Sequence, residues 1–158
     1  MSYLSFIPAK LLLLLAISPL HGVQKNTATQ NDVPAITKIS YSSSGGRGGN
    51  TVSLDITANA LVYVQGHSGS EKTIREKTSR SLWNSLVKAI NTKDIDRVKS
   101  NPGHALYDGV DVTITVDKGK QIHSIVNGSE DALNYGRIKT FTDILQNQLS
   151  RLEKKIRW

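Results

Sequence analysis

The chain has 158 residues, a formal net charge of +7 at pH 7 and no cysteine. The lack of cysteine excludes a disulfide scaffold and a lipid anchor of the bacterial lipoprotein type, so a hydrophobic core must supply the stability. The positive charge favours an acidic protein partner or an anionic envelope surface over a nucleic acid, because the basic stretches lack the interleaved aromatic residues that stack on bases. A merely solvated basic surface is the simpler alternative.

The first residues predict a cleavable secretory signal peptide over residues 1–22. A single basic side chain, Lys10, precedes an apolar run over residues 11–20. About ten apolar positions suit the core of a signal peptide and fall short of the roughly 20 that a membrane-spanning helix needs. We expect cleavage after Gly22, a flexible leader over residues 23–35, and export to the periplasm or the medium. An uncleaved anchor or a buried core helix is the alternative.

Residues 36–77 show the alternation of apolar and polar side chains that is typical of half-buried strands. We expect strands at Ile39–Tyr41, Val52–Ile56, Leu61–Gln65 and around Ile74, with turns at Asn59-Ala60 and Gly66–Ser70 and a glycine- and serine-rich loop at Ser42–Asn50. Strands joined by such connections are expected to pair as antiparallel hairpins.

A helix is expected next, with Thr78 or Ser79 as its N-terminal cap. Its apolar residues recur at helical spacing and form one stripe, namely Leu82, Trp83, Leu86, Val87 and Ile90. A second short helical turn is expected over residues 94–98. The Asn-Pro-Gly sequence then predicts a loop over residues 100–108.

Strict alternation of Val110, Val112, Ile114 and Val116 predicts another strand, and a turn over residues 117–120 leads back into a strand over residues 122–126. The last helix is expected to begin at Asp131 or Tyr135, with Glu130 and Asp131 as the acids of its first turn. Its apolar stripe comprises Ile138, Phe141, Leu145, Leu149, Leu152 and Ile156. Both helical stripes are expected to pack against the sheet.

This order predicts an α+β fold. We expect a two-layer sandwich in which an antiparallel sheet, in the order ββββ-α-ββ-α, carries two helices on one face. Residues 36–158 are expected to form a single domain without an internal repeat.

The loop SSSGGRGGN is longer than a hairpin turn requires and carries Arg47 near its tip. A phosphate-binding loop would need a Lys-Ser or Lys-Thr pair and a helix after the glycines, whereas a strand pattern follows here. An RNA-binding segment would need many Arg-Gly-Gly repeats, and this chain has one. A flexible hairpin connection is the simplest interpretation, and Arg47 with Gly48 is a candidate for contact with a partner.

The loop around NPGHALYDG is the other unusual connection. We expect Tyr107 either to be an exposed aromatic contact or to pack against Trp83. His104 of the same loop is a further candidate for partner contact, and as a metal ligand it would need carboxylates such as Asp108 and Asp111.

Catalytic patterns are weak. Gly66-His67-Ser68-Gly69 partly resembles a hydrolase nucleophile turn, but Ser70 stands where the second glycine should be and no helix is expected to follow. The histidines lack the spacing of a metal pair. The sequence therefore predicts no catalytic residue, no metal site and no cofactor.

The second half of the chain combines the leucine-rich helix SLWNSLVKAI, Tyr107-Asp108-Gly109 before an alternating strand, the hairpin VDVTITVDKGKQIHSIV and the amphipathic helix FTDILQNQLSRL. With these features, residues 82–152 resemble small exported bacterial proteins of unknown function. The resemblance implies no catalytic residues.

We expect an exported protein that binds another protein, as an immunity or inhibitor protein that neutralises a toxin or an enzyme by direct contact. Arg47, Gly48, His104 and Tyr107 are the candidate contact residues. One alternative is a small periplasmic hydrolase that uses His67 and Ser68. Another is an envelope-associated structural protein whose basic face lies against anionic lipid or glycan.

Overall fold

The computed structural model describes residues 35–67 and 69–156. The expected signal peptide and nearly all of the expected leader lie outside these described residues. The elements are, in chain order, β1 (Lys38–Gly45), β2 (Asn50–Ile56), β3 (Leu61–His67), β4 (Ser70–Glu76), α1 (Arg80–Ala89), α2 (Thr92–Ile95), η1 (His104–Tyr107), β5 (Val110–Asp117), β6 (Ile122–Val126), η2 (Gly128–Glu130), α3 (Ala132–Tyr135), η3 (Gly136–Ile138) and α4 (Lys139–Glu153). The three η elements are single turns of 3-10 helix.

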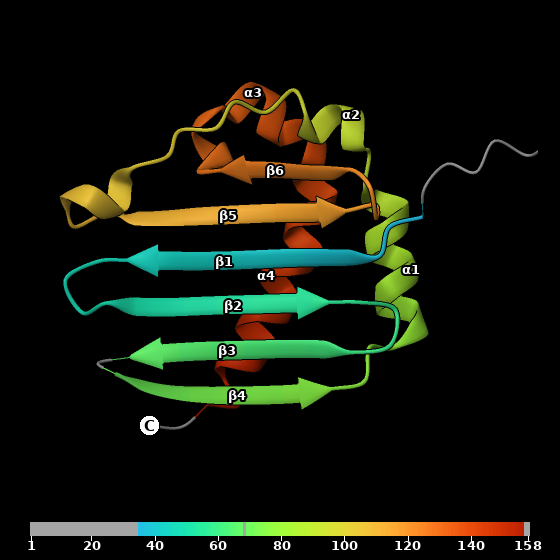
Figure 1. Cartoon of the computed structure of the whole chain (residues 1–158). Coiled ribbons are helices and arrows are strands. Elements are labelled where there is room, and N and C mark those ends of the chain that lie inside the picture. Colours follow the sequence, from blue (N-terminus) through green and yellow to red (C-terminus); the bar gives the residue numbers. More distant parts are fainter. Residues whose placement is uncertain (1–34, 68, 157–158) are drawn as a thin grey trace, which may run out of the picture. The chain divides into compact units, whose positions relative to one another are not determined.

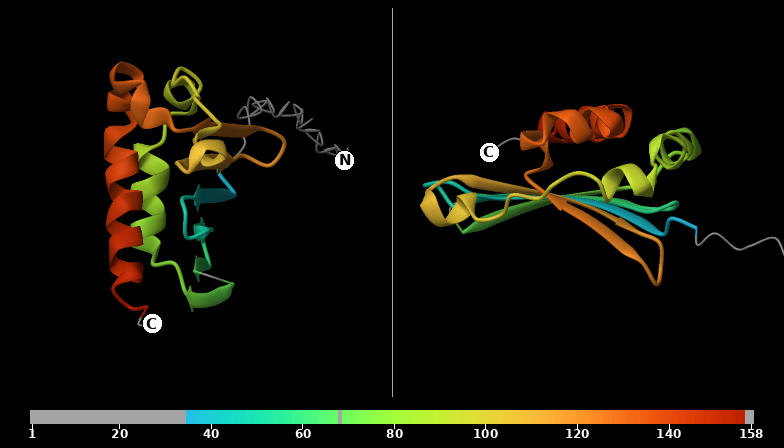
Figure 2. Two further views of the ribbon diagram at one scale, coloured as in Figure 1. Left: turned by 90° about the vertical axis from the view of Figure 1, so that its left-hand side faces the viewer. Right: turned by 90° about the horizontal axis from the view of Figure 1, so that it is seen from above.

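The strands form one antiparallel sheet in the order β4-β3-β2-β1-β5-β6 (Figure 1). The first four strands pair with their neighbours in sequence, and β5 then pairs with β1 rather than with β4. Figure 2 shows α1 and α4 side by side over the same face of this sheet. The expected α+β class with an antiparallel sheet is thus confirmed, and the short elements α2, α3 and η1–η3 are additions to it.

The core lies between the sheet and these helices. Its sheet residues are Ile39, Leu54, Ile56, Leu61, Tyr63, Ile114, Val116 and Ile125. Its helical residues are Leu86, Ile95, Ile138, Phe141, Leu145, Leu149 and Leu152, and Val98 joins them from the segment after α2. Of the stripe expected for the last helix, the four residues that lie in α4 are buried as expected, Ile138 is buried in η3, and Ile156 lies beyond α4 and is only partly buried. The α1 stripe is narrower than expected, because Val87 is 36% exposed while Leu82, Trp83 and Ile90 pack at the margin of the core.

The expected loop at Ser42–Asn50 is too long. Residues 42–45 continue β1, Asn50 begins β2, and the connection itself spans residues 46–49. Glycine has low strand propensity, and serine is common in turns. They are nevertheless extended here because β1 lies inside the sheet and forms backbone hydrogen bonds with β2 on one side and β5 on the other. The turn expected at Gly66–Ser70 is also too long, because the pairing of β3 with the edge strand β4 extends to His67↔Ser70.

The last helix is interrupted, which the sequence pattern did not predict. Asp131 does not lie in the first turn of α4 but caps the separate helix α3, and its carboxylate accepts hydrogen bonds from the backbone amide of Lys99 and from Asn134. These bonds hold the pKa of Asp131 below its ordinary value, the largest cause being the Lys99 amide. The 3-10 turn η3 separates α3 from α4. Glu130 belongs to η2.

Glu76 connects the edge strand β4 to the last helix. Its carboxylate accepts hydrogen bonds from Arg151 Nη2 at 2.9 Å and from Lys155 Nζ. These two bonds lower the pKa of the Glu76 carboxyl, and burial opposes them. The side chain is 27% exposed, so solvent screens the attraction in part.

We predict that Glu76→Gln lowers the free energy of unfolding at pH 7 by about 0.5–1 kcal/mol. Because folding lowers the pKa of Glu76, this contribution is present above the pKa of the unfolded chain and disappears as the pH falls through the folded-state pKa. Urea unfolding at pH 7 and in acid should show the difference from wild type shrinking toward zero. Glu71→Gln on the exposed side of the same strand is the control. An equal effect from both variants, or a difference that persists in acid, would contradict the assignment.

Candidate functional site

Two loops meet at one end of the sheet. One is the connection between β1 and β2, and the other is the η1 loop, which comprises residues 103–109. Antiparallel pairing of β1 with β5 places Gly45, at the end of β1, opposite Val110, at the start of β5. The backbone amide of Gly46 donates a 2.8 Å hydrogen bond to the carbonyl of Gly109. We call residues 45–50 and 103–109 together the loop end; both segments lie at the same side of the sheet in Figure 1.

Two glycines permit this close approach. Gly45 has φ = 126°, and a Cβ placed there would collide with the carbonyl oxygen of Gly109. A Cβ at Gly109 would in turn lie 2.7 Å from the carbonyl oxygen of His104. Gly45 and Gly109 are therefore required because the backbones of the two loops lie too close together for a side chain at either position.

The side chains of Asp111 and Asn127, which we call the polar clamp, hold the η1 loop in place by hydrogen bonds. Asp111 accepts hydrogen bonds from the backbone amides of Gly103 and His104, at 3.2 and 3.0 Å, and from Asn127 Nδ2 at 2.6 Å. The Asn127 side chain, the first cause, and the amides of this loop hold the pKa of Asp111 below its ordinary value. The carboxylate consequently remains ionised, and the loop is anchored by charge-assisted hydrogen bonds.

Asn127 is the buried half of the clamp, with only 6% of its surface exposed. Its Oδ1 accepts the amide of Val112 at 2.8 Å, and its Nδ2 also donates to the carbonyl of Asn101 at 2.7 Å. Its φ of 51° lies in the left-handed region, where asparagine is better tolerated than most residues. Through these bonds, Asn127 connects β5, the end of β6 and the η1 loop.

The side chains at the tip of the loop end project into solvent. Arg47 is 91% exposed at its side chain, and its Nε lies 3.7 Å from the carboxylate of Asp108. Tyr107 is 87% exposed, so it does not pack against Trp83, and its neighbour Leu106 is 82% exposed. Gly48 lies in the same connection as Arg47, beside the side chain of Asn50. Three of the four candidate contact residues therefore share one exposed surface.

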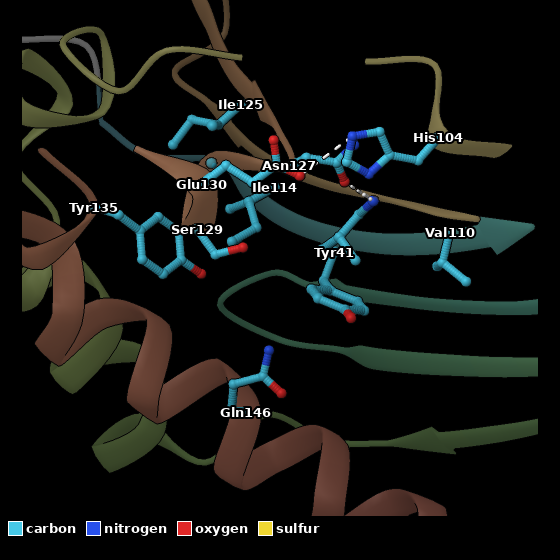
Figure 3. A pocket seen from close by; sticks show the side chains of 12 residues that line it. Tyr41, His104, Val110, Ile114, Ile125, Asn127, Ser129, Glu130, Tyr135 and Gln146 are labelled. Atoms are coloured by element: carbon cyan, nitrogen blue, oxygen red, sulfur yellow. Dashed lines mark hydrogen bonds and ion pairs between the residues drawn. The ribbon is translucent and has the colours of Figure 1, made fainter. Parts of the chain in front are cut away.

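His104, the fourth candidate, faces a pocket behind this surface. Its Nε2 lies 3.2 Å from Glu130 Oε1 of η2, and Asn101 also donates a hydrogen bond to Glu130. The pocket has a volume of about 290 Å³ and lies between the sheet and α4 (Figure 3). Its lining comprises Tyr41, His104, Val110, Val112, Ile114, Ile125, Asn127, Gly128, Ser129, Glu130, Tyr135 and Gln146.

Sequence analysis missed most of this site. The sequence pattern gives Leu106 and Val110 no role in contact, suggests Asp111 only as a possible metal-binding carboxylate beside His104, and does not indicate that Asn127 holds a loop. Asn-Gly is a signal for left-handed backbone. It does not indicate which strands and loops the amide side chain will join, because those partners lie at distant places in the sequence.

The residues considered for catalysis or metal binding have other contacts. His67 Nδ1 lies 2.6 Å from Asn50 Oδ1, and Ser68 lies outside the described residues. Asp111 is occupied by the clamp and Asp108 pairs with Arg47, so neither carboxylate joins His104 as a ligand. Within residues 35–67 and 69–156, no group of three or more His, Asp or Glu side chains is placed to hold a metal ion.

No protein-family model matches the chain, and no curated protein matches it in sequence. The resemblance to small exported bacterial proteins therefore stays a prediction. In the part of the chain that the structure describes, no helix is both long and apolar enough to cross a membrane.

We predict that Asn127→Gly lowers the free energy of unfolding by about 1–3 kcal/mol, because it leaves buried backbone groups and Asp111 without their partner. Glycine keeps the left-handed backbone, so strain does not account for the loss. Hydrogen exchange should show faster exchange of the Gly103 and His104 amides.

Asp108→Gly is the matched control, because Asp108 is also left-handed, with φ = 60°, but is exposed and outside the clamp. It should leave stability unchanged or slightly raised. A comparable loss of stability in both variants would mean that the backbone conformation, and not the buried amide, holds the loop.

Proposed function

We propose that the protein is an exported binding protein that neutralises an enzyme or a toxin by direct contact through the loop end, as an immunity or inhibitor protein does. The observation that carries the proposal is the pairing of a fixed backbone with freely exposed side chains. Gly46 and Asp111 hold the two loops by hydrogen bonds, while Arg47, Leu106 and Tyr107 extend into solvent.

This combination suits tight binding for a physical reason. Association is weakened by the entropy lost when loops become ordered, and a loop already held by backbone hydrogen bonds loses less of it. Tyrosine and arginine are the residue types that most often dominate binding energy at the centre of an interface. An exposed Leu-Tyr pair beside an arginine is therefore better explained as a contact surface than as ordinary solvated surface.

The rest of the chain is consistent with this role. The signal-like N-terminus favours export, and the net charge of +7 would attract an acidic partner over a distance. We further propose that the domain is a two-layer sandwich, so that α1 and α4 cover the sheet face and leave the loop end free. Such a domain would act as a rigid support for two loops and would need no catalytic group of its own.

The test is a pull-down with the tagged chain from its own cell envelope and secreted fraction, followed by measurement of the dissociation constant for any stoichiometric partner. We predict that Arg47→Ala and Tyr107→Ala each weaken binding about tenfold or more, which corresponds to roughly 1.4 kcal/mol. Both variants should unfold like wild type, since neither side chain is buried.

Lys120→Ala combined with Ile122→Ala is the matched control. It removes a cation and an exposed apolar side chain, with Ile122 67% exposed, at the opposite end of β5 and β6. Binding should be unaffected. Loss of binding in this control, or unchanged binding in the loop-end variants, would refute the surface assignment. Recovery of no partner from either fraction would count against the binder itself and in favour of lipid, glycan or hydrolase assays.

A further inference from the structure

We propose that the pocket behind the loop end is a subsite for one basic side chain, lysine or arginine, of the bound protein. The inference rests on the proposed function, because it assigns a ligand class to the same end of the molecule. Two residues of the pocket lining lie in or next to the η1 loop. His104 belongs to the loop, and Val110 begins β5 directly after it. A partner docked on Tyr107 and Arg47 would therefore lie next to its mouth.

One wall of the pocket is apolar. Val110, Val112 and Ile114 project from β5 toward the cavity, and Val110 is 43% exposed. The ring of Tyr41, on the neighbouring strand β1, lies beside them (Figure 3). Lysine and arginine carry long aliphatic stems that they bury along such surfaces while the charged group reaches a polar environment. Aromatic rings add attraction for a cation.

The opposite wall carries neutral polar groups. Figure 3 shows Ser129, Tyr135 and Gln146 directed into the cavity from η2, α3 and α4. Burial raises the pKa of both Tyr41 and Tyr135, so their hydroxyls stay neutral near pH 7. Hydroxyl and amide oxygens accept hydrogen bonds from an ammonium or a guanidinium group. Tyr41 already forms hydrogen bonds with Ser43 and Gln146, and Tyr135 forms one with Thr142, so a cationic guest would use the remaining acceptor capacity of these oxygens.

The charge of the pocket favours a positively charged side chain over a negatively charged one. Of the twelve lining residues, Glu130 alone carries a permanent charge. Its Oε1 lies 3.2 Å from His104 Nε2 and its Oε2 accepts a hydrogen bond from Asn101, and no lysine or arginine of the described residues lies within ion-pair distance of it. At close range this carboxylate attracts a cation and repels an acidic side chain, although the chain as a whole carries a net charge of +7.

The size of the cavity limits how large a part of the partner can enter it. A volume of about 290 Å³ is at the lower end of the range for small-molecule pockets. It accommodates a single long side chain and is too small for a segment of secondary structure. The guest is therefore one projecting residue of the partner, and the loop-end contacts supply the remaining interface.

The test uses the full chain, labelled with ¹⁵N, and titrates it with three probes by NMR. Acetyl-lysine methylamide and acetyl-arginine methylamide represent the proposed guest, and acetyl-norleucine methylamide is the apolar probe of matched length. We expect the basic probes to shift the amide signals of Val110, Val112 and Gln146 with millimolar affinity. The norleucine probe should bind more weakly.

Glu130→Gln should weaken binding of the basic probes by about fivefold, the loss expected for one partly exposed charge. The substitution keeps an oxygen that can accept the Asn101 hydrogen bond, so the fold should persist, and circular dichroism checks this. Glu71→Gln on the exposed side of β4, outside the lining, is the control and should leave the affinity for the basic probes unchanged.

Equal binding of the norleucine probe, unchanged affinity in Glu130→Gln, or absence of any shift with the basic probes would each overturn the proposal. These outcomes are separate from those of the pull-down. If a partner binds through Arg47 and Tyr107 while the basic probes fail, only the subsite is wrong. If no protein partner exists but the basic probes bind in a Glu130-dependent manner, the pocket is a site for basic groups and the proposed function is wrong.

Discussion

Strand β1 forms backbone hydrogen bonds with β2 on one side and β5 on the other, and the rest of the structure depends on this double pairing. It joins the four-strand hairpin series that begins the domain to the hairpin that follows α1. It also sets the register that places Gly45 opposite Val110, so that two connections about sixty residues apart become neighbours. Without this pairing, neither the loop end nor the pocket behind it would exist.

The buried Asn127 amide couples this architecture to the candidate site. Its hydrogen bonds extend to Val112 of β5, to the segment that carries Asn101 and to Asp111. Because buried polar groups are costly when unpaired, this network tolerates few alternative arrangements. The same bonds that close the β5–β6 hairpin thereby fix the position of Tyr107. The Asn127 side chain therefore contributes both to the stability of the fold and to the position of the η1 loop.

The loop end and the pocket differ in exposure and in charge, and in the proposed complex they would contact different parts of the partner. Arg47 and Tyr107 are exposed and lie on the outer surface, whereas Tyr41 and Gln146 lie farther in, between the sheet and α4. The basic chain as a whole favours an acidic partner surface, and Glu130 provides a local site of opposite sign. Opposite local charges of this kind contribute more to orientation and specificity than to overall affinity.

Sequence by itself determined the elements whose signal is local. The alternation in Val110–Val116, a cap at Thr78 or Ser79 and the stripe from Phe141 to Leu152 predicted β5, α1 and α4, since periodicity directly reflects which face is buried. Local signals also indicated Arg47 and Tyr107 as contacts, but not that they share a surface. Only the tertiary structure decided the extension of β1 through Ser42–Gly45, the break before α4 and the clamp at Asn127. Each of these depends on hydrogen-bond partners distant in sequence, which no local pattern encodes.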